Sequence, residues 1–220
     1  MNAWSDMNAK KPKTLLLATH NRGKLRELRE LIADLPNVTL RCLADLDEHL
    51  EVEETGKTFA ENAELKARVV AEATGAITLA DDSGLEVDAL GGRPGVFSAR
   101  YAGPDATDAD RVAKLLAELI DNPEAERKAR FRCAVALVRP QDPALDGDDK
   151  SVLVALEEGV SEGTILRAPV GKSGFGYDPV FFSPTLGKTF AEAGAAEKNR
   201  VSHRGRAMLA ILPALRALLS

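Results

Sequence analysis

Hydrophobic and polar positions follow strand-like and helix-like spacings in turn along the first third of the chain. An apolar run at 14–18 predicts a buried strand, and apolar residues at helical spacing over 25–35 predict a helix after it. A second strand is expected at 39–43. A helix should then run from the capping-box sequence at 58–61 to a closing glycine at Gly75.

The remaining pattern predicts further strands and two more helices. The short apolar run at 77–79 reads as a buried strand that ends at an acidic pair. A helix is expected after Thr107, and the runs at 131–138 and 152–156 form a predicted antiparallel hairpin. A helix running to Leu219 closes the chain. These elements predict an α/β protein in which the hairpin region could form a second lobe beside a cleft.

Composition and charge limit the class of protein. The 220 residues suffice for one sizeable core, and 45% hydrophobic with 29% charged residues is ordinary for a globular protein. A net charge of -5 argues against a general nucleic-acid coat protein, and no apolar run approaches the ~20 residues of a membrane span. Cys42 and Cys133 lie far apart and indicate a reducing compartment. We expect a disordered tail at 1–13, a domain at 14–220 and a cytoplasmic location, since residues 1–13 lack the apolar core of a secretory signal.

Two adjacent carboxylates stand where the predicted strand at 77–79 ends. Asp81 and Asp82 are followed by Ser83 and Gly84. Like charges this close repel each other, so the pair needs a cation, a proton or water nearby. Ligands of α/β sheets also bind outside the carboxyl ends of strands. The alternative is a solvated turn, because Asp, Ser and Gly are common turn residues.

The turn between the first predicted strand and helix carries hydroxyl, amide and cationic groups. Thr19, Asn21 and Lys24 stand at the start of the helix. Free backbone N–H groups and the positive end of the helix dipole favour an anion there. The alternative is a capped helix with solvated basic residues.

Two later clusters combine aromatic and polar side chains. The sequence at 174–179 places two glycines beside Phe175, Tyr177 and Asp178, which suits a planar ligand that stacks on a ring, or an aromatic-anchored turn. Ser202 can cap the last helix, which puts His203 and Arg204 in a first turn where the dipole disfavours cations. Basic residues there suggest a nearby anion or carbonyl ligand, or a solvated basic turn.

Five clusters in one order resemble the inosine triphosphate pyrophosphatase family, also called Ham1-like or non-standard purine nucleoside triphosphate pyrophosphatases. The resemblance extends from about Thr14 to the final helix. The extra residues at 1–13 and His20, where a glycine is common, are the departures. The clusters are Thr19-x-Asn21-x-x-Lys24, Glu53-Glu54-x-Gly56, Asp81-Asp82-Ser83-Gly84, Phe175-Gly176-Tyr177-Asp178 and Ser202-His203-Arg204.

The resemblance implies a fold, a reaction and partners. The family fold is an α/β protein with a long twisted mixed sheet flanked by helices, with two lobes around a central cleft. The implied reaction is Mg²⁺-dependent hydrolysis of inosine, deoxyinosine and xanthosine triphosphates to the monophosphate and pyrophosphate. A homodimer is expected, with no nucleic-acid or membrane partner.

The resemblance also assigns roles to residues. Asp82 resembles the family's general base and, with Glu53, its metal ligands, although Glu54 is a close rival of Glu53. Ser83 would contact the nucleotide, Phe175 would stack on the base, and His203 and Arg204 would read the base edge. The other substrate-binding residues implied are Thr19, His20, Asn21, Arg22, Gly23 and Lys24 around the phosphates, assisted by Lys66 and Lys198, and Gly176, Tyr177 and Asp178 around the base.

Two other functions remain open on the sequence alone. One is a related pyrophosphatase that acts on pyrimidine or otherwise modified nucleoside triphosphates. The other is a non-catalytic nucleotide-binding module, which would predict a lost carboxylate at position 82, whereas Asp82 is present.

Overall fold

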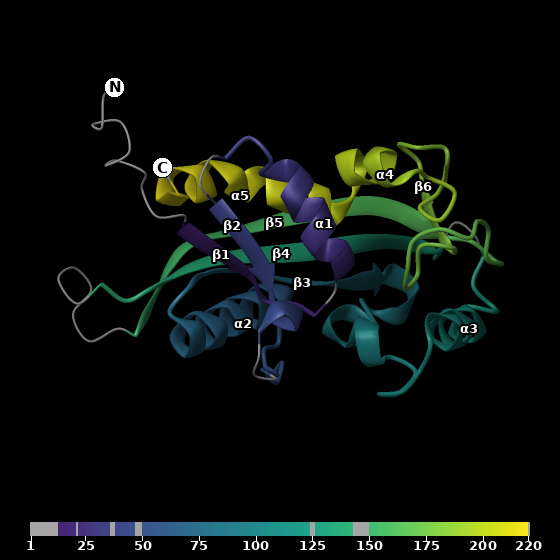
Figure 1. Cartoon of the computed structure of the whole chain (residues 1–220). Helices are drawn as coiled ribbons and strands as arrows, with labels where there is room; N and C mark the ends of the chain where they lie inside the picture. The colour runs from purple at the N-terminus through teal and green to yellow at the C-terminus, as the bar shows by residue number, and fades with distance from the viewer. Residues whose placement is uncertain are drawn as a thin grey trace, which may run out of the picture.

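A seven-stranded mixed sheet forms the centre of the protein (Figure 1). The structure is a computed structural model, and it describes residues 13–20, 22–35, 38–46, 50–123, 126–142 and 150–219. The strand order is β2-β1-β3-β4-β5-β6-β7, in which β1 pairs in parallel with β2 and β3, and all later pairs are antiparallel. The strands are β1 (Lys13–Leu17), β2 (Val38–Cys42), β3 (Ile77–Val87), β4 (Lys128–Pro140), β5 (Ser151–Ile165), β6 (Phe181–Ser183) and β7 (Lys188–Thr189).

Helices cover both faces of this sheet, which confirms the predicted α/β class with a mixed sheet. In Figure 1, α2 lies on one face, and α1 and α5 lie on the other. Each face has its own apolar core, because neighbouring residues of β1, β3 and β4 point to opposite sides. The helices are α1 (Arg22–Leu31), α2 (Phe59–Thr74), α3 (Asp108–Glu118), α4 (Ala195–Val201) and α5 (His203–Leu219).

Local capping explains where α2 begins and ends and where α3 begins. The Thr58 hydroxyl accepts a hydrogen bond from Glu61 N, and Gly75 ends α2 in the left-handed conformation. Only half of the predicted capping box forms there, because the Glu61 carboxylate accepts from the backbone N of Lys57. Thr107 caps α3 as predicted. No helix among the described residues is long and apolar enough to cross a membrane.

The predicted end of the third strand is wrong. β3 does not stop after Leu79 but continues through Asp81 and Asp82 to Val87. The strand can carry the two charges because successive side chains point to opposite faces and each carboxylate has its own partners. The parallel neighbour β1 does end level with Leu79, so the acidic pair still lies just beyond the carboxyl end of a parallel strand.

Parts of the predicted organisation lie outside the described residues. These parts are residues 1–12 of the expected tail and 143–149 of the loop between β4 and β5. Lys13, the last residue of that expected tail, opens β1. The division of 14–220 into two lobes stays a prediction.

A buried arginine ties the end of α3 to β5 and the segment after it. Arg127 is 1% exposed and donates hydrogen bonds to the carbonyls of Leu119, Ile165 and Leu166 at 2.6, 2.8 and 2.9 Å. We expect Arg127→Leu to lower the free energy of unfolding by at least about 3 kcal/mol, because each unsatisfied buried carbonyl costs about 1–3 kcal/mol. Urea denaturation measures this loss. The exposed Arg167, which donates to the carbonyl of Asn122, is the control, and an equally small loss for both leucine variants would contradict the prediction.

Candidate active site

Two adjoining hollows lie where β1 ends and β3 carries its acidic pair. The first, the Phe175 hollow, has a volume of about 270 Å³, and the second, the Thr19 hollow, about 580 Å³. Lys24, Glu54 and Lys66 line both hollows, so the two form one continuous site. The Phe175 hollow is lined by the predicted residues Asp82, Ser83, Phe175, Gly176, Tyr177, Asp178, Lys198, His203 and Arg204, and the Thr19 hollow by Thr19, His20 and Glu53.

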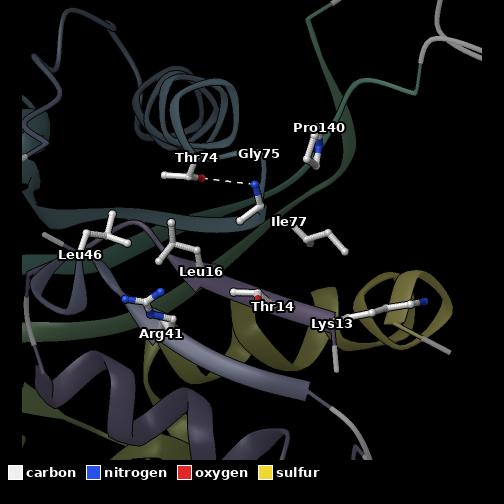
Figure 2. A pocket seen from close by; sticks show the side chains of 10 residues that line it. Lys13, Thr14, Leu16, Arg41, Leu46, Thr74, Gly75, Ile77 and Pro140 are labelled. Carbon is white, nitrogen blue, oxygen red and sulfur yellow. Dashed lines mark hydrogen bonds between the residues drawn. The ribbon is translucent and has the colours of Figure 1, made fainter. Parts of the chain in front are cut away.

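A third hollow of about 470 Å³ lies beside the start of β1 (Figure 2). Its cationic side chains are turned to the backbone: Lys13 donates to the carbonyl of Leu218 at 3.0 Å, and Arg41 to that of Asp45. It carries none of the predicted site residues, so we place the site at the two adjoining hollows.

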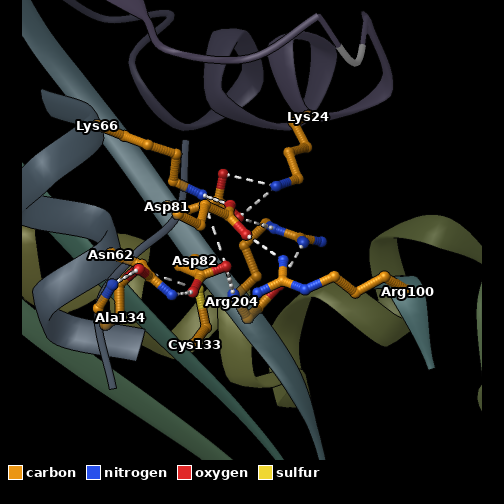
Figure 3. A network of polar contacts seen from close by, with 12 residues as sticks. Lys24, Asn62, Lys66, Asp81, Asp82, Arg100, Cys133, Ala134 and Arg204 are labelled. Carbon is orange, nitrogen blue, oxygen red and sulfur yellow. Dashed lines mark hydrogen bonds and ion pairs between the residues drawn. The ribbon is translucent and has the colours of Figure 1, made fainter. Parts of the chain in front are cut away.

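Asp81 is a buried anion held between two cations from the α1 and α5 face of the sheet. Its carboxylate lies 2.7 Å from the Lys24 ammonium and 3.1 Å from Arg204 Nε, and only 1% of the residue is exposed (Figure 3). Burial alone would raise the pKa of Asp81, but the charges of Lys24 and Arg204 outweigh it and hold the pKa well below its usual range. Asp81 is therefore an ionised anchor for both cations.

Asp82 points to the opposite face and has different partners. It accepts a hydrogen bond from Asn62 Nδ2 at 3.0 Å and lies 3.5 Å from the Lys66 ammonium, both on α2 (Figure 3). Burial raises the pKa of Asp82 above its ordinary value, although Lys66 opposes the shift. The two neighbouring carboxylates thus have pKa values shifted in opposite directions, a pattern that separates a proton acceptor from a permanently charged group.

Glu54, rather than Glu53, is the carboxylate that the structure brings next to Asp82. Its Oε1 lies 2.7 Å from Lys66 Nζ, so the ammonium is shared between Glu54 and Asp82. Burial works to raise the pKa of Glu54, but Lys66 and Arg100 outweigh it and hold the pKa below its ordinary value. Glu53 is exposed on the wall of the Thr19 hollow.

The loop at 174–178 presents an aromatic face to the site. Phe175 is 46% exposed, and the cationic groups of Lys198 and Arg204 lie 4.7 and 5.5 Å from the centre of its ring. Asp178 holds the loop, since its Oδ2 accepts from Phe175 N at 2.9 Å and lies 2.5 Å from Lys198 Nζ. Tyr177 is buried and donates to the carbonyl of Ser98. Phe175 is thus a partly exposed ring on a fixed loop, with two cations beside it.

The start of α5 brings His203 and Arg204 to the same wall. The Ser202 hydroxyl accepts from Gly205 N as an N-cap, and a glycine at position 159 lets α5 approach β5, since a Cβ there would lie 2.1 Å from the carbonyl oxygen of His203. His203 stacks on Phe131 at 4.7 Å. Burial, with the charges of Arg204 and Lys198, holds the pKa of His203 well below its ordinary value, so the imidazole is neutral.

Comparison with known protein families shows what this chain is similar to. The model of the Ham1 family matches residues 15–214. The chain belongs to the Ham1 family. This membership confirms the resemblance that the five sequence clusters indicated.

Relatives of this Ham1 chain are similar over nearly their whole length. A dITP/XTP pyrophosphatase of Shigella flexneri is 49% identical over 203 residues, which are 92% of this chain and 98% of the relative. The solved structure of a HAM1 protein from Coxiella burnetii has a TM-score of 0.81 and 42% identity, and covers 93% of this chain and 99% of its own. The nucleoside-triphosphatase / dITP/XTP pyrophosphatase of Mycobacterium abscessus has a TM-score of 0.71 and 44% identity, covering 91% and 99%.

The sequence indicated only some of the residues that the structure places at the candidate site of this Ham1 protein. Asn21 lies outside the described residues, while Arg22 and Gly23 open α1. Asp81 stands in the same motif as Asp82, but the resemblance gives a role only to Asp82. The sequence did contain a feature that could indicate Asn62 as a site residue, because Asn62 lies four residues before Lys66 on one helix face. Asp108 and Arg111, which also line the Phe175 hollow, resemble an ordinary first helical turn.

Proposed function

We propose that the protein hydrolyses non-standard purine nucleoside triphosphates, namely ITP, dITP and XTP, to the nucleoside monophosphate and pyrophosphate. This activity would remove deaminated purines from the nucleotide pool. The observation that carries the proposal is the pair of adjoining hollows, one rich in lysines and carboxylates and one built on an aromatic platform, joined at Lys24, Glu54 and Lys66. The names of relatives nearly half identical to the chain support it.

The two hollows suit the two ends of a nucleotide. A purine would stack on Phe175, with its 6-oxo group directed to Arg204, which only donates hydrogen bonds. The triphosphate would extend past Lys24 and Lys66 towards Thr19, His20 and the N-terminus of α1. This orientation places the α-phosphorus near Asp82.

Asp82 is the proposed general base. A water molecule attacks the α-phosphorus and gives its proton to Asp82, while the bond between the α-phosphorus and the bridging oxygen breaks and pyrophosphate leaves. In the protein without a bound ion, burial raises the pKa of Asp82 above that of an ordinary aspartate. Asn62 fixes the orientation of its carboxylate through the 3.0 Å hydrogen bond.

The carboxylates near Lys66 fit a hard divalent cation. Mg²⁺ is usually held by one or two carboxylates together with substrate phosphates, and Glu54 and Asp82 already share a cationic partner in Lys66. We propose these two residues as the ones that would hold Mg²⁺, with Glu53 as the alternative that the sequence favoured. When bound, the ion would neutralise charge on the phosphates. Among the described residues, no group of three or more His, Cys, Asp or Glu side chains could hold a metal ion.

Lys24→Ala should lower kcat/KM for every triphosphate by about the same factor. The ammonium lies at the junction of the two hollows, and a hydrogen bond to a charged group contributes about 1.5–3 kcal/mol, or roughly 10- to 100-fold. The measurement is kcat/KM for ITP, XTP and ATP. Arg26→Ala on the exposed face of α1 is the control. A loss restricted to one base would mean that Lys24 contacts the base and not the phosphates.

Pyrophosphate release from a panel of triphosphates tests the proposed function. With Mg²⁺ present, ITP, dITP and XTP should be hydrolysed far faster than ATP, GTP or the pyrimidine triphosphates. A preference for pyrimidine or otherwise modified substrates would favour the alternative pyrophosphatase, and no release from any of them would contradict catalysis. The homodimer and the cytoplasmic location stay predictions, which size-exclusion chromatography and cell fractionation would test.

A further inference from the structure

Two buried side-chain nitrogen atoms have no hydrogen-bond partner in the part of the chain that the structure describes. They are Arg111 Nε and His203 Nδ1, and both residues line the Phe175 hollow. Most buried polar groups in folded proteins are paired with protein groups or water, so an unpaired one beside a hollow calls for a partner there, such as a water, an ion or a ligand. Two such atoms at one hollow indicate a ligand with hydrogen-bonding groups at two separate points.

Arg111 reaches the hollow from a different wall than Arg204 does. It lies on α3, whereas Arg204 lies on α5 and contacts Asp81 and Ser83 of β3. The Arg111 guanidinium is oriented by Asp108, whose Oδ1 lies 2.5 Å from its Nη1. Only 18% of the Arg111 side chain is exposed. The site therefore offers donors from two sides.

Asp108 also connects α3 to the aromatic platform. Its Oδ2 accepts a hydrogen bond from the backbone N of Gly176 at 2.7 Å, one residue after Phe175 (α3 and this region lie at the same end of the sheet in Figure 1). Asp108 thus contacts both Arg111 and the residue that follows Phe175. A base stacked on Phe175 would have Arg111 at one edge and Arg204 with His203 at another.

We propose that Arg111 is a specificity-determining residue that donates a hydrogen bond to the 2-oxo group of a xanthine base. This inference rests on the proposed function and names how the same site distinguishes purines at C2. Xanthine has an acceptor at C2, hypoxanthine has a hydrogen, and guanine has an amino donor. An arginine only donates, so it favours xanthine, accepts hypoxanthine and opposes guanine.

The proposal accounts for a discrimination that Arg204 alone does not provide. Guanine and hypoxanthine share the 6-oxo group, so a donor at C6 cannot tell them apart. A donor at C2 opposes the 2-amino group of guanine, because two donors face each other and the amino group also loses its hydrogen bond to water. Each such contact changes relative rates by roughly ten-fold or more.

Two substitutions of Arg111 test this role. Arg111→Met removes the donor and should lower the XTP/ITP ratio of kcat/KM by about ten-fold. Arg111→Gln supplies an amide oxygen that can accept from the 2-amino group, so its GTP/XTP ratio should rise. Lys114→Met is the matched control, because Lys114 lies one turn along α3, donates to the carbonyl of Tyr101 and does not line the hollow. It should leave all these ratios unchanged.

The outcomes separate this inference from the proposed function. If the wild-type protein hydrolyses neither ITP nor XTP, the proposed function itself is wrong. Normal wild-type hydrolysis with unchanged XTP/ITP and GTP/XTP ratios in the Arg111 variants would overturn only the role of Arg111. Thermal melts establish that each variant is folded. Should Arg111→Met unfold, Arg111→Gln carries the test, since its amide can still donate to Asp108.

Discussion

Asp82→Asn is expected to leave a folded protein that has almost no pyrophosphatase activity. The substitution keeps the size of the side chain and an oxygen that can accept from Asn62, so the packing against α2 should persist. It removes the proton acceptor and one negative charge next to Lys66 and Glu54. Loss of a general base alone costs about 10²- to 10⁴-fold in rate, so turnover should fall at least that far.

Steady-state pyrophosphate release from ITP, with thermal unfolding as the measure of folding, checks this result. Asp88→Asn is the matched control, because Asp88 directly follows β3, pairs with Arg130 at the surface and does not line the site. Asp88→Asn should remain close to wild type. Near wild-type turnover by Asp82→Asn would remove the basis for the mechanism proposed here.

Arg204→Ala should collapse the preference for ITP over ATP. A 6-oxo group gains a charge-assisted hydrogen bond from Arg204, whereas the 6-amino group of adenine puts two donors in opposition. Sites built to hydrogen-bond a substrate group can reject the wrong analogue by ~10⁴-fold or more. Activity on ITP should therefore fall far more than activity on ATP.

Arg204 also balances the buried charge of Asp81, so a second variant is needed. Arg204→Lys keeps a positive charge near Asp81 but removes the planar fork of donors. We expect it to retain most of the stability while losing much of the selectivity. The measurement is kcat/KM for both substrates in all three proteins. An unchanged ITP/ATP ratio in Arg204→Ala would mean that Arg204 does not read the base.

Local signals made much of the fold predictable. The caps at Thr58 and Thr107 and the left-handed Gly75 act within a few residues, so both ends of α2 and the start of α3 follow from the sequence. The sequence did not predict that β3 continues past Leu79, because two adjacent aspartates and a glycine favour a turn when only neighbouring residues are considered. Their partners come from three helices that are distant in sequence, and these contacts stabilise the strand.

Some residues of the candidate site were likewise predictable from the sequence, and others were not. Asp82, Phe175 and Arg204 stand in compact motifs, and the resemblance of those motifs to the Ham1-like family selected them. Asp108 and Arg111 were not selected, since they fit an ordinary helix start and contact the site only because α3 packs beside the loop at 174–178. A contact between residues 68 positions apart leaves no local pattern to detect.

Side chains alternate between the two faces along β3. The pairing register of this strand therefore decides which partners Asp81 and Asp82 have. β3 pairs with β4 without interruption from Thr78 opposite Val138 to Val87 opposite Ala129. A slip of one residue would turn every side chain to the other face, and Asp81 and Asp82, the proposed proton acceptor, would exchange surroundings. Insertions or deletions within this paired stretch should therefore be far more damaging than changes in the loops, even where they preserve both carboxylates.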